Sequence, residues 1–542
     1  MFNIGRLSIA VVLFSVALSY VTLYLMNATK SVTTMANYGL LFVSNVSKVN
    51  NFFLKSSNYV RKVLYINVNS SDCGAISQQI VNVYSKVTSQ CNNLDVRLIL
   101  KPFDNIKKIN TAHSIDLILY DNSLAKEVDR LKESVVSLQS GYNVQSIDLK
   151  DEQTPETATE TVKTYEYVVL GGTFDRLHNG HKILLSQAAL RTTKLLTVGV
   201  TDVNMIKSKK LWELIEPVET RIKSVLEFLT DINPTIEYNV LPIQDMYGPT
   251  KDDPRFQLIV LSEETDRAGD KVNEARREGG LPALDKYLVG LAGDARAAGD
   301  EEAKLSSSNQ RMRLLGTTLR APEPNPNIPK WPYVIGLAGG IAAGKSGIAE
   351  RLRAKGAAVI NCDVIAHELY RPGLPLNTTI AETFGSDVIT SDGEVDRRKL
   401  GQIVFADSSQ LHKLNSLVWP AVIAEASRRA AAAGAAGAAG GAAGARVAVL
   451  EAAVLLQAGW GKHCHQLWTA IVPPDEAVKR IMARNGLPEE EARQRVLSQP
   501  SNQEQVAAAH VVFSPYWSPE HTQRQVDRAW DDLQELLKNR GE

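Results

Sequence analysis

Short apolar runs alternate with amphipathic stretches in residues 60–120. Lys62–Val68, Asp95–Leu100 and Ser114–Tyr120 have the length and the apolar content of strands, whereas Ile76–Ser89 carries its apolar residues at helical spacing. This pattern predicts a small α/β unit. No motif within it indicates a chemistry.

The same alternation recurs twice further along the chain. Successive strands joined by amphipathic helices are typical of parallel sheets with helices on their faces. We therefore predict an α/β fold for both later regions. The predicted strand, helix and strand are Tyr165–Leu170, Lys182–Arg191 and Leu195–Val200 in the first region, and Tyr333–Ala338, Gly347–Lys355 and Ala357–Ile360 in the second.

The chain has 542 residues, more than one ordinary domain of about 150 residues. Two stretches look like linkers. Asp151–Lys163 is rich in Glu and Thr, and Ala321–Pro329 contains four prolines, which favour an extended segment. We predict an apolar segment (1–30), an N-terminal α/β region with its linker (31–160), a first functional domain (161–320), a Pro-rich linker (321–330) and a second functional domain (331–542).

The N-terminal segment Leu7–Met26 is uncharged and dominated by Leu, Val, Ile and Ala. Twenty helical residues rise about 30 Å, which matches the hydrocarbon thickness of a bilayer. A secretory signal peptide is the alternative, but no small-residue cleavage site follows the apolar run. We predict an uncleaved anchor or organelle-targeting segment. Its orientation stays open, because Arg6 and Lys30 place positive charge on both flanks.

Charge and cysteine content narrow the class of protein. The chain has 60 Lys and Arg against 60 Asp and Glu, and this balance argues against a nucleic-acid partner. Its four cysteines form no C-x-x-C pair, as expected in a reducing compartment. His463-Cys464-His465 lacks a second pair of ligands at zinc spacing, so we expect no metal there.

Arg429–Arg446 consists almost entirely of Ala and Gly. Alanine favours helix, whereas the interspersed glycines oppose it. We expect a mobile insertion on the surface, without a function of its own.

The clearest chemical motif follows the predicted strand Tyr333–Ala338. It has the pattern G-x-x-x-x-G-K-S in a strand–loop–helix setting, which is typical of a loop that surrounds the phosphates of ATP with backbone amides. Lys345 is expected to reach the β- and γ-phosphates, and Ser346 to ligate Mg²⁺. The loop consists of Gly339, Gly340, Ile341, Ala342, Ala343, Gly344, Lys345 and Ser346.

Asp363 follows the next predicted strand and is our candidate base, because a hydroxyl acceptor is hardly ionised at neutral pH. Its alternative role is to cap the helix that follows; the two roles can coexist. Downstream, Arg480, Arg484, Arg493 and Arg495 crowd one helical stretch. One interpretation is that these arginines close over the transferred phosphates. The other is that they lie on a solvated helix face and pair with the glutamates at 489–491.

These residues resemble dephospho-CoA kinases. The resemblance rests on residues 339–346, 361–367, 393–397 and 404–405 and on the stretch from Arg484 to Gln499. It implies transfer of the ATP γ-phosphate to the ribose 3′-hydroxyl of dephospho-CoA, with Arg484 and Arg495 as catalytic residues beside Lys345 and Asp363. Trp419 and Gln457 depart from the family pattern, in the region expected to bind the acceptor.

A second candidate site lies upstream, in Gly171–His181, between the predicted strand and helix of the first functional domain. His178 and His181 stand three residues apart at the predicted helix start, a position that favours an anion. Imidazole donors there can stabilise charge on a phosphate under attack. Alone, His178 would more often be a capping or surface histidine.

The H-x-G-H pattern resembles nucleotidyltransferases, and within them phosphopantetheine adenylyltransferases of the eukaryotic type. The matching blocks are Gly172–His181, the lysines near residue 209 with Arg221, and the serine motif at 304–311. The resemblance implies a Rossmann-like domain. It assigns catalysis to His178, His181 and Lys209, with Lys207 and Lys210 as alternatives, and ATP binding to Gly172, Thr173, Phe174, Ser306, Ser307, Ser308 and Arg311.

Together the two halves resemble the family of bifunctional coenzyme A synthases. This implies the small-molecule substrates 4′-phosphopantetheine, dephospho-CoA and ATP, and a P-loop kinase domain after the Rossmann-like one. Two alternatives remain open: a P-loop kinase for another nucleotide with a ligand-binding upstream domain, and a membrane-tethered scaffold with degenerate sites. We expect membrane association at the mitochondrial outer membrane or another cytoplasmic membrane face, with the matrix or cytoplasm as alternatives.

Overall fold

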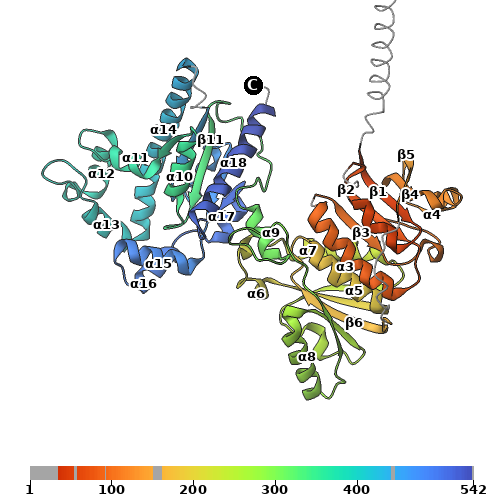
Figure 1. The fold of residues 1–542 in the computed structure, drawn as a ribbon. Coiled ribbons are helices and arrows are strands. Elements are labelled where there is room, and N and C mark those ends of the chain that lie inside the picture. The colour runs from red at the N-terminus through yellow and green to blue at the C-terminus, as the bar shows by residue number, and fades with distance from the viewer. Residues whose placement is uncertain (1–34, 54–57, 92, 151–160, 441–445, 540–542) are drawn as a thin grey trace, which may run out of the picture. The chain divides into compact units, whose positions relative to one another are not determined.

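The computed structural model describes residues 35–53, 58–91, 93–150, 161–440 and 446–539. The chain divides into two compact units (Figure 1). Among the described residues, the first unit contains those of 35–202 and 218–296, and the second contains those of 203–217 and 297–539. Each unit is built on parallel sheets, which confirms the predicted α/β class.

The first sheet of the first unit has the strand order β3-β2-β1-β4-β5, and all of its pairs are parallel. Its central strand β1 is fully buried from Leu40 to Val43, as a strand covered on both faces must be. The elements are β1 (Ala36–Val43), β2 (Val60–Val68), α3 (Cys73–Gln90), β3 (Asp95–Ile99), β4 (Ile115–Asp121), α4 (Val128–Ser134) and β5 (Leu138–Ile147).

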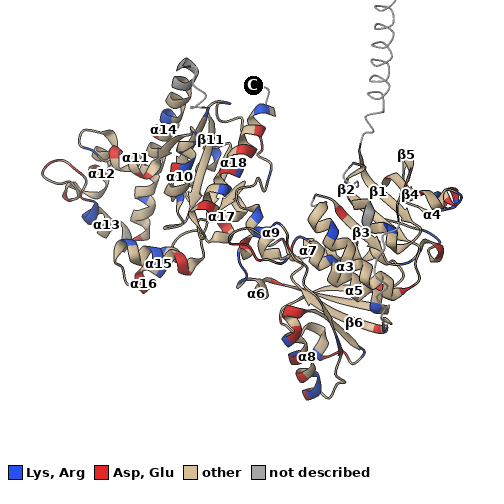
Figure 2. Cartoon of the chain, viewed as in Figure 1, with Lys and Arg blue, Asp and Glu red and all other residues tan. Residues whose placement is uncertain are grey.

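The second sheet of this unit has the order β10-β9-β6-β7-β8 and is again parallel throughout. In both sheets the first strand in sequence lies between the second and the fourth. The elements are β6 (Tyr165–Gly172), α5 (Asn179–Arg191), β7 (Thr192–Thr201), α7 (Val218–Ile232), β8 (Glu237–Ile243), β9 (Leu258–Ser262), α8 (Asp266–Glu278) and β10 (Asp285–Val289). Charged residues of both signs follow one another along α8 (Figure 2).

The second unit contains a parallel sheet in the order β12-β13-β11-β14-β15. Every residue of its central strand β11 is buried. Its strands are β11 (Tyr333–Gly339), β12 (Ala358–Asn361), β13 (Val447–Glu451), β14 (Gln466–Ala470) and β15 (Val511–Phe513). Its helices from β11 onward are α10 (Lys345–Ala354), α11 (Cys362–Leu369), α12 (Pro375–Phe384), α13 (Arg397–Ala406), α14 (Ser408–Gly440), α15 (Pro474–Asn485), α16 (Glu489–Leu497), α17 (Asn502–Ala508) and α18 (Pro519–Asn539).

Two upstream segments belong to the second unit by their packing. Residues 203–217, which include α6 (Val203–Ile206), contribute Leu214 to a small core with Leu315, Ile471 and Val512. Residues 297–320, which include α9 (Ser307–Leu314), pair with the edge strand β15 and with the residue before it, through the backbone bonds Gly316 N to Val512 O and Leu319 N to His510 O. From the sequence, we predicted that both segments belong to the first functional domain (161–320).

Several local expectations need correction. The sequence pattern predicted no strand before Lys62, but β1 (Ala36–Val43) precedes that position and is the centre of its sheet. The Ala- and Gly-rich stretch was expected to be a mobile insertion, whereas α14 continues through it to Gly440, and Ala430 is buried in the core. Alanine's helix propensity and the burial of Ala430 outweigh the glycines there. Residues 441–445 lie outside the described residues.

The apolar segment Leu7–Met26 also lies outside the described residues, as does most of the Glu/Thr-rich linker. Within the described ranges, no helix combines the length and the apolar character needed to cross a bilayer.

Candidate active sites

The phosphate loop of the second unit lies at the carboxyl end of β11, between the ends of β13 and β14. Two of its glycines adopt backbone conformations that other residues avoid, with φ of +147° at Gly339 and +89° at Gly344. A Cβ atom would lie 2.7 Å from the Ala470 carbonyl oxygen at the first position, and 2.7 Å from Pro515 at the second. The chain therefore needs glycine at both positions to turn tightly into α10.

A cavity of about 580 Å³ opens at this loop. Its walls carry both signs of charge: three cations and two carboxylates. The lining residues are Ile341, Ala342, Gly344, Lys345, Ser346, Gly347, Asn361, Asp363, Glu451, Ala453, Arg480, Arg484 and Gln499. The structure thus places the predicted residues Lys345, Ser346, Asp363 and Arg484 on one cavity.

The Lys345 ammonium donates to the carbonyl oxygens of Gly339 and Gly340, at 2.8 and 3.0 Å. Burial lowers its pKa, and the nearby carboxylates of Asp363 and Glu451 oppose that shift. The loop amide of Ile341 donates to the Gln499 side chain at 2.6 Å. The loop is therefore held both from within and from the segment that follows α16.

Glu451, which the sequence analysis missed, ends the buried strand β13 and is itself only 5 % exposed. It accepts hydrogen bonds from the Ser346 hydroxyl at 2.7 Å and from the Asn361 amide at 3.3 Å. The sequence does indicate Glu451, because it directly follows the apolar run 447–450. An acidic residue at the carboxyl end of a parallel strand lies at the edge of the sheet where the neighbouring strands also end. A hydroxyl and a carboxylate this close suit a hard cation that also takes phosphate oxygens.

Asp363 lies in the first turn of α11 and is exposed on the cavity wall. The cap of this helix is Asn361, whose side chain accepts from the Val364 amide at 3.0 Å. The capping role considered for Asp363 is therefore wrong. Its carboxylate lies on the same cavity as Lys345.

The four predicted arginines divide into two pairs. Arg480 and Arg484 line the cavity, and Arg480 donates to the carbonyl oxygens of Ala342 and Pro515. Arg493 forms ion pairs with Asp475 and Glu489, as expected for an arginine on a solvent-exposed helix face. Arg495 is exposed in α16 and does not line the cavity.

The H-x-G-H motif of the first unit follows the central strand β6, at the carboxyl edge of its sheet. Helix α5 begins at Asn179, three residues earlier than predicted, so His178 is the N-cap residue and His181 lies in the first turn. The two imidazole rings stack with their centroids 3.7 Å apart, and Phe174 packs against His181 at 5.3 Å. The left-handed backbone at Phe174 and Arg176 turns the loop into this arrangement.

Both ring nitrogens of His178 are buried and make no hydrogen bond in the structure. Burial, assisted by His181, holds the pKa of His178 well below its usual value, so this imidazole is neutral at physiological pH. Arg221 of α7 is 1 % exposed and donates to the carbonyl oxygens of Thr173 and Thr201, at 2.7 and 2.9 Å. It fixes the loop on which Gly172 and Thr173 lie.

The lysine segment and the serine motif lie in the second unit. Lys207 and Lys210 are exposed, and Lys209 is half-buried. Arg311 of α9 is buried and donates through Nε to the Lys210 carbonyl oxygen at 2.8 Å, and through Nη2 to Ser308 at 3.4 Å. Arg311 therefore ties the serine motif to the lysine segment.

The serine motif begins with the cap of a helix. Ser306 is the N-cap residue of α9, and its hydroxyl accepts from the Asn309 amide at 3.2 Å. Ser307 and Ser308 form the first turn and are half-buried.

Two side chains of residues 463–465 make structural contacts. The His465 Nδ1 atom accepts from the Val334 amide at 2.9 Å, and the Cys464 thiol is buried against the Trp460 carbonyl. Within the ranges given above, no three His, Cys, Asp or Glu side chains gather as a metal-binding group.

The two halves of the chain match two different protein families. The dephospho-CoA kinase family model matches residues 333–515, and the cytidylyltransferase-like model matches residues 169–268. A dephospho-CoA kinase from Geobacter sulfurreducens is 36% identical over 197 residues, which are 36% of this chain and 96% of that protein. A second, from Symbiobacterium thermophilum, is 37% identical over 197 residues, or 36% of this chain and 80% of that protein.

The upstream half has relatives of its own. A phosphopantetheine adenylyltransferase from Saccharomyces cerevisiae is 37% identical over 150 residues, which are 28% of this chain and 49% of that protein. The chain thus spans about half the length of this relative. With its cytidylyltransferase-like region upstream, the chain belongs to the dephospho-CoA kinase family.

Proposed function

We propose that this chain catalyses two successive reactions. The first transfers the adenylyl group of ATP to 4′-phosphopantetheine, giving dephospho-CoA and pyrophosphate. The second transfers the γ-phosphate of another ATP to the ribose 3′-hydroxyl of dephospho-CoA, giving CoA and ADP. One observation carries the proposal: the H-x-G-H loop and the phosphate loop each follow the central strand of their own parallel sheet, where α/β proteins bind nucleotides.

In the kinase reaction the protein must position two substrates and balance developing negative charge. The amides of residues 339–346 surround the phosphates, and Lys345 and Arg484 supply cations on the same cavity. The exposed carboxylate of Asp363 accepts the proton of the acceptor hydroxyl as the new O–P bond forms. ADP leaves with the electrons of the broken bond to the β-phosphate oxygen.

Ser346 and Glu451 fit a magnesium ion, because Mg²⁺ commonly takes one or two protein oxygens together with phosphates and water. When bound, the ion would neutralise charge on the β- and γ-phosphates. The Asn361 amide donates to Glu451, which helps to orient the carboxylate toward Ser346.

Replacing Glu451 by glutamine should lower the kinase rate by about 10²-fold at limiting Mg²⁺, since a neutral amide attracts the cation far less. Increasing the Mg²⁺ concentration should recover part of the loss. The measurement is ADP formation from dephospho-CoA and ATP over a Mg²⁺ titration. Glu425→Gln is the control, because Glu425 pairs with Arg428 and Arg429 of its own helix α14. A Glu451→Gln enzyme with an unchanged Mg²⁺ dependence would exclude Glu451 from the metal site.

In the adenylyl transfer the nucleophile is a phosphate that is already ionised, so no general base is required. Its oxygen attacks the α-phosphorus of ATP, and the bond to the bridging oxygen of pyrophosphate breaks. The site must supply donors to the reacting phosphate and hold them in place. His178, His181 and Thr173 are such donors at a helix N-terminus, and Arg221 holds the loop that carries Thr173.

We assign Lys209 to catalysis and the serines 306–308 to ATP binding in this reaction. The assignment rests on their resemblance to the adenylyltransferase motifs. Arg311 supports it indirectly, because it holds the lysine segment and the serine motif together.

We also propose that residues 1–30 attach the chain to a membrane, at the mitochondrial outer surface or another cytoplasmic face. The motivation is the uncharged stretch Leu7–Met26. Imaging of a tagged full chain should show it on a membrane, and removal of residues 1–30 should release it. An unchanged distribution after the deletion would contradict this proposal.

The two activities can be tested one at a time. The purified chain should release pyrophosphate from ATP only when 4′-phosphopantetheine is added, and should form ADP when dephospho-CoA is added. A chain that forms ADP but releases no pyrophosphate would be a kinase with a ligand-binding upstream domain instead.

A further inference from the structure

The N-terminal sheet repeats the topology of the sheet that follows it, but not its motif. In both sheets the first strand is central, with the second and fourth strands beside it. Directly after that strand the second sheet carries the H-x-G-H loop, whereas the first carries Ser44-Asn45-Val46-Ser47. There Asp121 accepts from Ser44, Lys48 and Ser123, so these polar groups satisfy one another. The loop directly after β1 therefore carries no counterpart of the two histidines, and its described polar groups bind one another.

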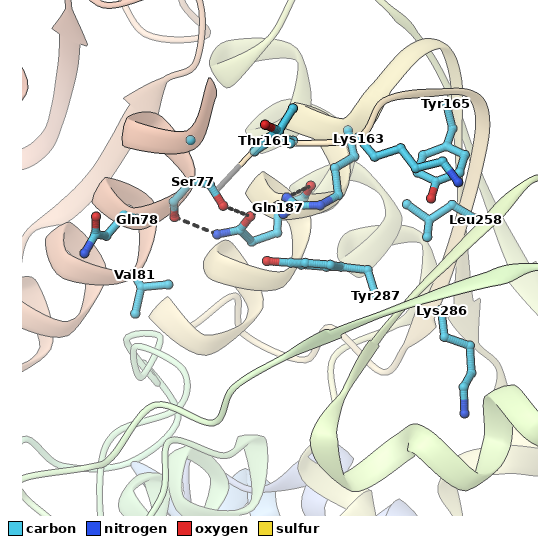
Figure 3. Close-up of a pocket in the computed structure, with 13 residues that line it drawn as sticks. Ser77, Gln78, Val81, Thr161, Lys163, Tyr165, Gln187, Leu258, Lys286 and Tyr287 are labelled. Atoms are coloured by element: carbon cyan, nitrogen blue, oxygen red, sulfur yellow. Dashed lines mark hydrogen bonds between the residues drawn. The ribbon is translucent and has the colours of Figure 1, made fainter. Parts of the chain in front are cut away.

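Helix α3 of this sheet lies antiparallel along α5, the helix that begins at the H-x-G-H motif. Near the start of α3, Ser77 donates to the Gln187 side chain at 2.9 Å and its carbonyl accepts from Gln187 at 2.8 Å (Figure 3). Near the end of α3, the Asn179 amide donates to the Thr88 hydroxyl at 2.9 Å. Polar contacts thus hold α5 at both of its ends.

A cavity of about 470 Å³ opens at the end of α5 that is remote from His181. Its walls include Ser77, Gln187 and Tyr287 (Figure 3). Arg191 also lines it, and its guanidinium lies over the Tyr287 ring, 3.5 Å from the ring centroid. None of the site residues predicted from the sequence lines it. This cavity therefore lies away from the H-x-G-H motif. The contacts that can hold the motif are those at the start of α5.

The start of α5 is anchored mainly through Lys182, the residue after His181. Lys182 is 5 % exposed, and its ammonium donates to the Asp95 carboxylate of β3 at 2.5 Å and to the Val96 carbonyl at 3.2 Å. Burial acts to raise the pKa of Asp95, but Lys182 and Arg97 outweigh it and keep that pKa below its usual value. Asp95 is therefore ionised and pairs with a buried lysine beside the catalytic motif.

The same network reaches α7, the helix that carries Arg221. Arg97 forms ion pairs with Asp95, with Glu227 at 3.0 Å and with Asp231. Asp231 also accepts from the Tyr65 hydroxyl and from the Ala112 amide. Both helices that place the donors of the adenylyl transfer are thus fixed to the N-terminal sheet by buried charges.

We propose that Asp95 is a positioning residue for the adenylyl transfer, and that the N-terminal sheet serves to hold the H-x-G-H motif in its reactive geometry. The inference rests on the proposed adenylyl transfer. His178 makes no side-chain cap on the first turn of α5, so this turn lacks the usual fixation from within. The contacts to Asp95 and Thr88 fix it from outside. A displacement of about 1 Å in such donors can cost about 10²-fold in rate.

The test is Asp95→Asn in the full chain. We expect kcat for pyrophosphate release to fall by about 10²-fold, the KM for ATP to change much less, and the kinase activity to remain. The matched control is Asp121→Asn, which removes a carboxylate of the same sheet that is buried and pairs with Lys48 instead of with a residue of α5. Equal losses of kcat in the two variants would mean that Asp95 only stabilises the fold, and would overturn the proposal. An Asp95→Asn enzyme with the original kcat would overturn it as well.

A second readout does not depend on the reaction. The chain has nine histidines, so spectra of chains with ¹³C in the histidine rings can be assigned by substitution. The resonances of His178 and His181 should shift in Asp95→Asn and stay unchanged in Asp121→Asn. Unchanged resonances in Asp95→Asn would refute the positioning role. If the unaltered chain released no pyrophosphate at all, the proposed function would fail, while the resonances would still decide the positioning.

A folding defect can be separated from the proposed effect. Asp95→Asn leaves the Lys182 charge buried without its carboxylate, a change that is strongly destabilising in general. The double variant Asp95→Asn, Lys182→Met removes that charge as well. It should recover the thermal stability but not kcat, because the start of α5 still lacks its contact with β3. Recovery of both would contradict the proposal.

Discussion

Replacing Lys345 by alanine should abolish the phosphorylation of dephospho-CoA, with a loss of about 10³-fold or more in kcat/KM. The lysine is the cation at the centre of the phosphate loop, where its ammonium bridges two loop carbonyls beside the cavity. Its charge is required when charge develops on the transferred phosphoryl group. The measurement is the formation of ADP and CoA from dephospho-CoA and ATP. The release of pyrophosphate from 4′-phosphopantetheine and ATP should not change.

The control for this substitution is Lys355→Ala. Lys355 ends the same helix but pairs with Asp527 at 2.7 Å and does not line the cavity. It should keep both activities. If Lys345→Ala retained more than a tenth of the kinase activity, the phosphate loop would not be the site of the second reaction.

Replacing His181 by alanine should lower pyrophosphate release by about 10²- to 10³-fold, the usual cost of one donor to a transition state. His181 lies in the first turn of α5, and its ring is held between Phe174 and the neutral His178. The substitution removes a hydrogen-bond donor to the reacting phosphate, and it also removes the ring against which His178 stacks. The kinase activity of the same preparation, measured with dephospho-CoA, reports that the second unit is intact and should equal that of the unaltered chain.

His412→Ala is the matched control, because His412 is an exposed histidine whose Nδ1 atom lies 2.7 Å from the Ser408 carbonyl oxygen of its own helix. It should not affect either reaction. Loss of both reactions in a folded His181→Ala protein would show that the two sites do not act independently.

The sequence alone was sufficient for the parts of the fold that depend on local signals. Buried parallel strands are continuous apolar runs, so β6 and β11 were predicted almost to the residue. Glycines that must turn tightly before a helix also form a local signal, and they identified the phosphate loop. Its neighbour Asp363 could be found because a polar residue at the end of a strand lies at the ligand edge.

Other features depend on partners that are distant in the sequence. The apolar part of β1 is only four residues, Leu40 to Val43, and nothing in it distinguishes a central strand from a short loop segment. The pairing of Glu451 with Ser346 spans 105 positions, and that of Lys182 with Asp95 spans 87. Such pairs follow from the strand order of a sheet, which the periodicity of a single strand does not contain.

The central claim, that one chain performs both reactions in sequence, can be tested by following two phosphorus atoms. The purified chain is supplied with 4′-phosphopantetheine and with ATP that carries ³²P at the α-position and ³³P at the γ-position. We expect CoA that contains the two isotopes in equal amounts, ³²P in the adenylyl group and ³³P in the 3′-phosphate. CoA that lacks either isotope, or a reaction that forms no labelled CoA, would contradict it.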